Sequence, residues 1–87
     1  MNKVIIYTTT YCGFCVAAKK LLKDLEIPFL EIDVTTDDEK RVWLVQRTGQ
    51  RTVPQILIGD KPIGGYTDLA AKSRSGELQA LLASVPS

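Results

Sequence analysis

The chain has 87 residues, of which 45% are hydrophobic and 24% are charged, a composition that fits one small folded domain spanning 1–87. Eleven basic residues balance ten acidic ones, so the net charge is +1 and no basic block predicts nucleic-acid binding. No apolar run approaches the roughly 18 residues that span a membrane, and the apolar stretch near the N-terminus is too short for a signal peptide. We therefore expect a cytoplasmic protein without a membrane partner.

The first predicted elements are a strand and an amphipathic helix. Residues 3–7 are rich in β-branched and aromatic side chains, which favours a buried strand. A helix is expected to begin just after Cys12 and to end before Pro28. Its apolar face has spacings of three and four, at Cys15, Ala18, Leu21, Leu22 and Leu25, and its solvated face carries Lys19, Lys20 and Lys23.

A second strand and helix follow. Residues 28–34 alternate in a pattern typical of a strand. The segment TDDE at 36–39 has the form of a capping box, in which Thr36 caps the helix and Glu39 reaches back to it. This helix is predicted to run to about Thr48, with Gly49 as its C-terminal stop. Aromatic side chains more often pack than bind, so we expect Tyr7 and Trp43 in the core.

The last part of the chain predicts a hairpin and two helices. Residues 53–58 form the third strand, 59–60 the turn, and 61–64 a partner strand that Pro62 suits to a sheet edge. Thr67 is expected to cap a short helix. The final helix has an apolar side made of Leu78, Leu81, Leu82 and Val85.

This order of elements predicts an α/β fold with one mixed sheet. The first strand, helix and second strand form a βαβ unit, whose two strands should be parallel. The hairpin adds two antiparallel strands, and helices cover both faces of the resulting four-stranded sheet.

Cys12 and Cys15 are the only cysteines, and the chain has no histidine. Histidine-dependent catalysis is therefore excluded, and one chain cannot supply the four ligands of a structural zinc site. A staple across so short a loop would stabilise little. Redox chemistry, ligands shared between two chains, and incidental cysteines remain as interpretations, of which redox chemistry is favoured.

The position of the cysteines predicts unequal roles for them. A helix start presents free N–H groups and a partial positive charge, which favour the nucleophilic thiolate at Cys12. Cys15 lies one turn later at the start of the apolar face, so it should be more buried. We therefore expect Cys12 to attack a disulfide and Cys15 to resolve the mixed disulfide.

Three motifs in order, VIIYTTTYCGFC, RTVPQILIG and GGYTDL, make the chain resemble a glutaredoxin over nearly its whole length. The resemblance implies a thioredoxin-like fold and an oxidoreductase acting in electron transport and cell redox homeostasis. Glutathione would be the reductant, and the substrates would be disulfide-containing or glutathionylated proteins. A thioredoxin-like reductant that does not use glutathione is a rival, against which the GGYTDL segment argues.

The resemblance also implies where glutathione binds. Pro54 would be cis and lie beside the cysteines, and the backbone of Val53 would pair with the cysteinyl part of glutathione. The γ-glutamyl carboxylate would bind at the helix start formed by GGYTDL. The residues implied as glutathione contacts are Tyr11, Phe14, Gln46, Arg51, Thr52, Val53, Pro54, Gly65, Thr67 and Asp68.

The chain departs from the pattern of many glutaredoxins in three respects. Thr9 stands where many members have a lysine, Tyr11 where a small residue is common, and Gly13 with Phe14 where most dithiol members have proline and tyrosine. CGF also begins the signature of the monothiol, cluster-binding members. The alternative function is therefore a binding protein, in which two chains hold a [2Fe–2S] cluster through Cys12 and glutathione thiolates. Otherwise we expect a monomer.

Overall fold

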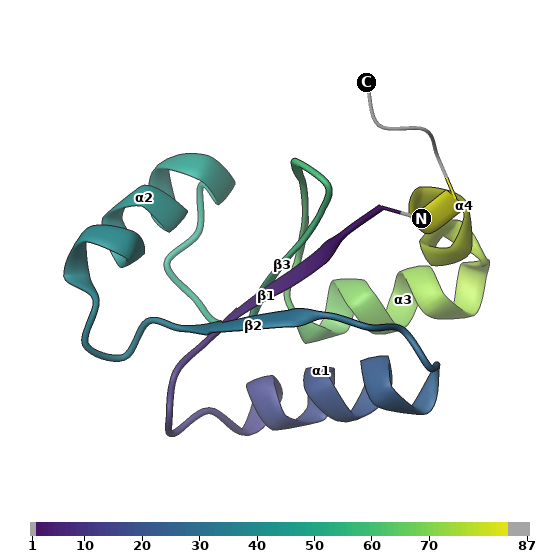
Figure 1. Ribbon diagram of the computed structural model, residues 1–87, viewed down its shortest axis with the longest axis horizontal. Coiled ribbons are helices and arrows are strands. Elements are labelled where there is room, and N and C mark those ends of the chain that lie inside the picture. Colours follow the sequence, from purple (N-terminus) through teal and green to yellow (C-terminus); the bar gives the residue numbers. More distant parts are fainter. Residues whose placement is uncertain (1, 84–87) are drawn as a thin grey trace.

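The computed structural model describes residues 2–83, which form four strands and four helices (Figure 1). In chain order these are β1 (Val4–Thr8), α1 (Gly13–Asp24), β2 (Leu30–Asp33), α2 (Asp38–Thr48), β3 (Gln55–Ile58), β4 (Lys61–Gly64), α3 (Tyr66–Ser75) and α4 (Glu77–Ala83). The predicted order of elements is confirmed. None of the helices in these residues is long and apolar enough to cross a membrane.

The strands form one mixed sheet in the order β2-β1-β3-β4. β1 is parallel to β2 and antiparallel to β3, and β4 pairs antiparallel with β3. Tyr7 of β1 lies between Ile32 of β2 and Gln55 of β3 in this register. Pro62 lies in the edge strand β4, as predicted.

Helices cover both faces of the sheet, with α1 and α3 on one side and α2 on the other (Figure 1). Side chains alternate along a strand, so β1 and β3 contribute to both layers. The larger apolar cluster contains Ile6 and Ile56 from the strands and Ala18 and Leu22 from α1. The smaller cluster lies under α2 and consists of Tyr7, Val34, Leu44 and Leu57, with Ile5, Ile32 and Val53 packed against it.

The helix ends are set by local hydrogen bonds. Cys12 is the N-cap of α1, and α2 ends at Gly49, which adopts the left-handed conformation with φ 75°. The predicted cap of α2 was wrong by one residue. Asp37, and not Thr36, accepts the hydrogen bond from the backbone N–H of Lys40 at 2.9 Å. Asp37 also donates its own N–H to the carbonyl of Val34, which fixes where the helix begins.

Two predicted strands are shorter than expected, because β2 covers only Leu30–Asp33 and β3 begins at Gln55. Val53 and Pro54 belong instead to the preceding loop. The apolar residues of α4 lie as predicted, with Leu78 and Leu82 buried, whereas Val85 falls outside the described residues.

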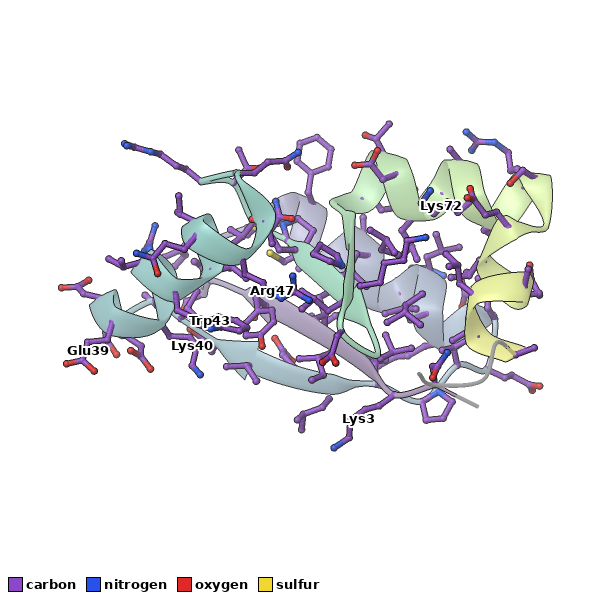
Figure 2. The ribbon with its side chains drawn as sticks, turned by 90° about the horizontal axis from the view of Figure 1, so that it is seen from above. Lys3, Glu39, Lys40, Trp43, Arg47 and Lys72 are labelled. Carbon is purple, nitrogen blue, oxygen red and sulfur yellow. The ribbon has the colours of Figure 1, made fainter. Side chains whose placement is uncertain are left out.

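Trp43 is not a core residue, contrary to the prediction, since it is 40% exposed. Its ring lies 5.7 Å from that of buried Tyr7, and the ammonium group of Lys40 lies 5.1 Å from its centre (Figure 2). Trp43 therefore covers the outer edge of the α2 layer. Lys19 also departs from a purely solvated role, because its Nζ atom lies 3.1 Å from Oε2 of Glu31.

Candidate functional site

The two cysteines lie at the N-terminus of α1, where they have different environments. The backbone N–H of Cys15 donates a hydrogen bond to Sγ of Cys12 at 3.1 Å. The Cys12 thiol lies 3.5 Å from the carbonyl oxygen of Val53, to which it donates. Cys12 is half-buried, whereas Cys15 is 1% exposed. The predicted difference in burial is confirmed, and the Cys12 sulfur lies at the helix N-terminus.

Burial, together with a hydrogen bond and the charge of the neighbouring Cys12 sulfur, raises the pKa of the Cys15 thiol to about 12. A backbone hydrogen bond from Thr9 and the charge of Lys19 act in the opposite direction. Cys15 is therefore a neutral thiol at ordinary pH. The Cys12 sulfur is thus accessible, and the protonated Cys15 sulfur is buried next to it.

A loop between α2 and β3 lies beside the cysteines. The peptide bond between Val53 and Pro54 is cis, and Pro54 is buried while Val53 is partly exposed. The loop borders a cavity of about 270 Å³. This cavity brings together seven of the ten residues predicted to contact glutathione, namely Phe14, Thr52, Val53, Pro54, Gly65, Thr67 and Asp68.

The far wall of this cavity is the start of α3. Gly65 lies so close to the loop that a Cβ atom there would meet the carbonyl oxygen of Pro54 at 3.2 Å. Gly64 has φ 107°, and a Cβ atom on it would collide with the side chain of Asp68. Gly65 therefore eases the approach of the helix to the loop, and Gly64 supplies the positive φ and the space for Asp68. The helix N-terminus therefore faces the cavity with unpaired N–H groups, which favour an anion.

The predicted capping role of Thr67 was wrong. The N-cap of α3 is Gly65, and the carboxylate of Asp68 accepts the backbone N–H of Gly65 at 3.1 Å. The helix begins at Tyr66, two residues earlier than a Thr67 cap would allow. Thr67 is exposed in the first turn of α3. Because it does not cap the helix, its side chain and its N–H can contact a ligand in the cavity.

Gln46 and Arg51 lie around a second cavity, of about 360 Å³, between α2 and the loop. Its lining also includes Arg41 and Val42, and it shares Gln50 and Val53 with the first cavity. The two cavities thus meet at the loop. The arrangement offers a negatively charged ligand a guanidinium group at one end and a helix N-terminus at the other.

Exposed aromatic side chains lie on either side of Cys12 in the sequence. Tyr11 is 96% exposed and Phe14 is 64% exposed. The ring of Phe14 stacks on that of Tyr66, with 6.2 Å between centroids. Tyr11 lines neither cavity, so the structure does not bring it together with the other predicted contacts.

Sequence reasoning missed three residues at this site, Gln50, Tyr66 and Gln55. Gln50 lines both cavities, and Tyr66 lines the first. Gln55 is 1% exposed, and its amide donates to the loop. A polar residue inside a predicted buried strand was a signal for Gln55, whereas nothing in the sequence pattern marked Gln50.

Comparison with known proteins shows the family of the chain. The glutaredoxin family model matches residues 4–63. The chain belongs to the glutaredoxin family. A glutaredoxin from Pseudomonas aeruginosa is 45% identical over 82 residues, which cover 94% of this chain and 98% of the relative. A probable glutaredoxin from Synechocystis is 42% identical, covering 97% of this chain and 78% of the relative.

Solved structures agree with this assignment. The crystal structure of a buckwheat glutaredoxin–glutathione complex is similar with a TM-score of 0.84 and 37% identity, covering 93% of this chain and 76% of that one. The solution structure of a glutaredoxin from Brucella melitensis has the same TM-score and 43% identity, covering 94% and 89%. The thioredoxin-like fold is confirmed, and the glutaredoxin is a glutathione-dependent thiol–disulfide oxidoreductase of the CxxC type.

Proposed function

We propose that Cys12 is the attacking thiolate of this glutaredoxin and Cys15 the resolving thiol. The observation that carries the assignment is the position of Cys12 at the N-cap of α1, with its sulfur hydrogen-bonded by the N–H of Cys15. Cys12 is also the more accessible sulfur of the two. The substrates are glutathionylated proteins and proteins with disulfide bonds.

With a glutathionylated protein, the Cys12 thiolate attacks the sulfur of glutathione in the mixed disulfide. The protein leaves as a thiolate that takes a proton from water, and a disulfide between Cys12 and glutathione remains. The thiolate of a second glutathione then attacks the bound glutathione sulfur, which releases oxidised glutathione and the Cys12 thiolate. Thiolate attack and thiolate departure balance in both steps.

With a protein disulfide, Cys12 first forms a mixed disulfide with the substrate. Cys15 then loses its proton and attacks the Cys12 sulfur, and the second protein thiolate leaves. Once Cys12 is in a disulfide it no longer carries the charge that raises the pKa of Cys15. Cys15 therefore becomes easier to ionise at the step that needs it. Two glutathione molecules reduce the resulting Cys12–Cys15 disulfide.

We place glutathione across the two cavities that meet at the loop. Its cysteinyl backbone pairs with Val53 next to Cys12, as an added strand would. Its γ-glutamyl carboxylate lies at the N-terminus of α3, near Thr67 and Asp68. The glycine carboxylate reaches Arg51 and Gln46. The other residues proposed to line the path are Phe14, Thr52, Pro54 and Gly65.

The cysteine roles are tested by two serine variants. Cys12→Ser should abolish the release of glutathione from a glutathionylated peptide, because no other exposed thiol is present in the sequence. Cys15→Ser should retain much of that activity and lose the reduction of protein disulfides. Equal loss of deglutathionylation in the two variants would contradict the assignment.

The placement of glutathione is tested at Arg51. Arg51→Leu removes a charge-assisted hydrogen bond and should raise KM for glutathione about tenfold or more. Arg74→Leu is the matched control, because Arg74 is exposed in the last turn of α3 and lines neither cavity. If both variants raised KM equally, the effect would be one of net charge, and the placement would be wrong.

We further propose that residues 1–87 act as one domain and as a monomer in the cytosol. A glutaredoxin of this kind needs a compartment in which glutathione keeps Cys12 and Cys15 reduced, as the cytosol does. Exposed Tyr11 and Phe14 beside Cys12 give protein substrates an apolar surface for contact. Electron transfer from glutathione to such proteins is the proposed role in redox homeostasis.

One observation favours a second function, the binding of a [2Fe–2S] cluster by a dimer. Gly13 is exposed, with nothing within 4 Å of the place where a Cβ atom would lie, so the loop at Cys12 has open space before it. Cys12 of each chain and two glutathione thiolates would hold the cluster, which would supply electron transfer or cluster delivery.

The cluster function is tested by anaerobic reconstitution with iron, sulfide and glutathione. Cys15→Ser removes the competing internal disulfide and should increase the iron and sulfide retained, with a mass near that of a dimer. Gly13→Pro should decrease them, because proline stiffens the loop. A colourless monomeric Cys15→Ser protein would exclude this function, and the proposal of an oxidoreductase function would stand.

A further inference from the structure

Gln55 is a polar residue in a strand that is otherwise apolar and fully buried. It is 1% exposed and is followed by Ile56, Leu57 and Ile58, all of them buried. Its side chain is on the sheet face of Tyr7 and Leu57, where α2 packs. Burial of an amide is unfavourable unless the amide is hydrogen-bonded. Its place in this layer therefore depends on what the amide contacts.

The amide nitrogen of Gln55 holds the loop that precedes β3. Nε2 donates to the carbonyl oxygen of Thr52 at 2.9 Å and to Oε1 of Gln50 at 3.1 Å, and it lies 3.3 Å from Oγ1 of Thr52. Gln50 and Thr52 are the two neighbours of Arg51. At the other end of the loop, the N–H of Gln50 donates to Oγ1 of Thr48. The loop is thus fixed from the strand side by one buried amide.

The orientation of this amide is dictated by the loop. The carbonyl of Thr52 can only accept, so rotating the amide by half a turn would place two oxygens against each other. In the observed orientation, Oε1 of Gln55 is the buried side-chain atom of residues 2–83 that has no hydrogen-bond partner. An apolar side chain would avoid this unpaired acceptor. The hydrogen bonds that Nε2 of Gln55 donates to the loop therefore compensate for its unpaired Oε1 atom.

We propose that Gln55 is the positioning residue of the glutathione-binding loop. It lines neither of the two cavities proposed to hold glutathione. Instead it holds Gln50 and Thr52 so that the Arg51 guanidinium and the Val53 backbone present a fixed pair of contacts to the ligand. This role rests on the proposed placement of glutathione.

Gln55→Met tests the role, because it keeps the length of the side chain and removes the donor. We expect the backbone amides of Thr52 and Val53 to exchange hydrogen faster in the ligand-free protein. KM for glutathione should rise about tenfold, the effect of losing buried hydrogen bonds, while kcat at saturation stays within about twofold. Leu57→Val is the matched control, since it perturbs the packing of the same layer, against which Val53 lies, and leaves the hydrogen bonds of the Gln55 amide in place.

Gln55→Glu adds a readout that a packing role would not move. When protonated, the introduced carboxyl can donate to the Thr52 carbonyl, and when ionised it repels that oxygen. The ratio of the variant KM to the wild-type KM should therefore rise with pH. Two ionisable groups are placed beside it, Tyr7, which lies opposite Gln55 in the sheet, and Asp68, which lines a small cavity with Gln55. Both are present in the wild type and cancel in the ratio.

The results separate this role from the placement of glutathione. If Arg51→Leu raises KM and Gln55→Met does not, Gln55 has no positioning role. If Leu57→Val raises KM as much as Gln55→Met, the effect is one of packing, and the proposal is overturned. If neither Arg51→Leu nor Gln55→Met changes KM, the placement of glutathione fails together with the role of Gln55. Faster loop exchange with a raised KM in Gln55→Met alone supports it.

Discussion

The apolar layers on the two faces of the sheet differ in size. Among residues 2–83, eleven buried residues form the cluster that faces α1, α3 and α4, whereas four form the cluster under α2. Leu44 is the buried residue of α2, and Arg47 joins that helix to the β3–β4 turn by donating to the carbonyl of Asp60 (Figure 2). The α1 side of the sheet, called here the scaffold face, carries most of the core, whereas the apolar layer under α2 is thin.

The proposed chemistry is divided between these faces. The cysteines stand at the start of α1, whose Ala18 and Leu22 are anchored in the larger cluster. The cavity with Arg51 lies beside α2, over the smaller one. A nucleophile needs a fixed position, whereas a binding surface can adjust to its ligand. The comparison therefore predicts that substitutions on the two faces affect stability and glutathione binding differently.

The largest loss of stability is expected from Leu22→Ala. Leu22 is fully buried in the larger cluster, so its truncation should cost about 3–4 kcal/mol of unfolding free energy. Urea denaturation would measure the loss. The fraction that remains folded should keep a wild-type KM for glutathione. A raised KM in that fraction would show that the scaffold face also shapes the binding surface.

Leu44→Ala should cost less, about 2 kcal/mol, because its surroundings are shallow and can relax into the gap. Leu44 lines the cavity that contains Arg51, so we expect KM for glutathione to rise a few-fold even where the protein is fully folded. Urea denaturation and steady-state kinetics on the same preparation would check both parts. A loss of stability equal to that of Leu22→Ala, with KM unchanged, would remove the distinction between the two faces.

The smallest effect concerns the polar margin of the α1 face. A hydrogen bond from buried Thr8 to Oε2 of Glu31, at 2.8 Å, lowers the pKa of Glu31, and Lys19 contributes to the shift. A carboxyl whose pKa is lowered by folding stabilises the protein above its unfolded pKa, and the contribution is lost as pH falls through the folded value. The Glu31 side chain is 37% exposed, so solvent screens this contribution to about 0.5 kcal/mol or less.

Thr8→Val should raise the pKa of Glu31 and flatten the fall in stability between about pH 5 and pH 3. An NMR titration of the Glu31 carboxyl would report the shift directly. Lys20→Met serves as the control, because the ion pair of Lys20 with Asp24 is exposed and lies on α1 alone. An unchanged Glu31 titration in Thr8→Val would assign the shift to Lys19 instead.

Much of this architecture could be predicted from the sequence, because each prediction depended on a strong local preference. The spacing of Cys15, Ala18 and Leu22 defined the buried face of α1. Gly49 ended α2 because glycine adopts the left-handed conformation without strain. The motifs at Cys12 and Pro54 supplied the central part of the candidate site.

The errors arose where tertiary contacts choose between equivalent local options. Thr36 and Asp37 are both good caps, and the hydrogen bond from Asp37 to Val34 decides between them. Thr67 is not the N-cap of α3, because the helix begins earlier, where Gly65 lies close to Pro54. Trp43 was assigned to the core because side-chain type does not reveal how thin the α2 layer is. The contacts of Gln55 depend on a loop shape that no periodicity encodes.

Pro62 has a consequence for how this sheet meets other chains. An exposed edge strand invites extended polypeptides to pair with it, which leads to aggregation. Pro62 provides no N–H group on β4, and the opposite edge, β2, carries the exposed carboxylates of Glu31 and Asp33. Both edges therefore discourage edge-to-edge association. In the proposed binding mode, an extended ligand backbone pairs with Val53 instead, next to the sulfur of Cys12. The fold would thus direct strand-like ligands to the place where the proposed chemistry occurs.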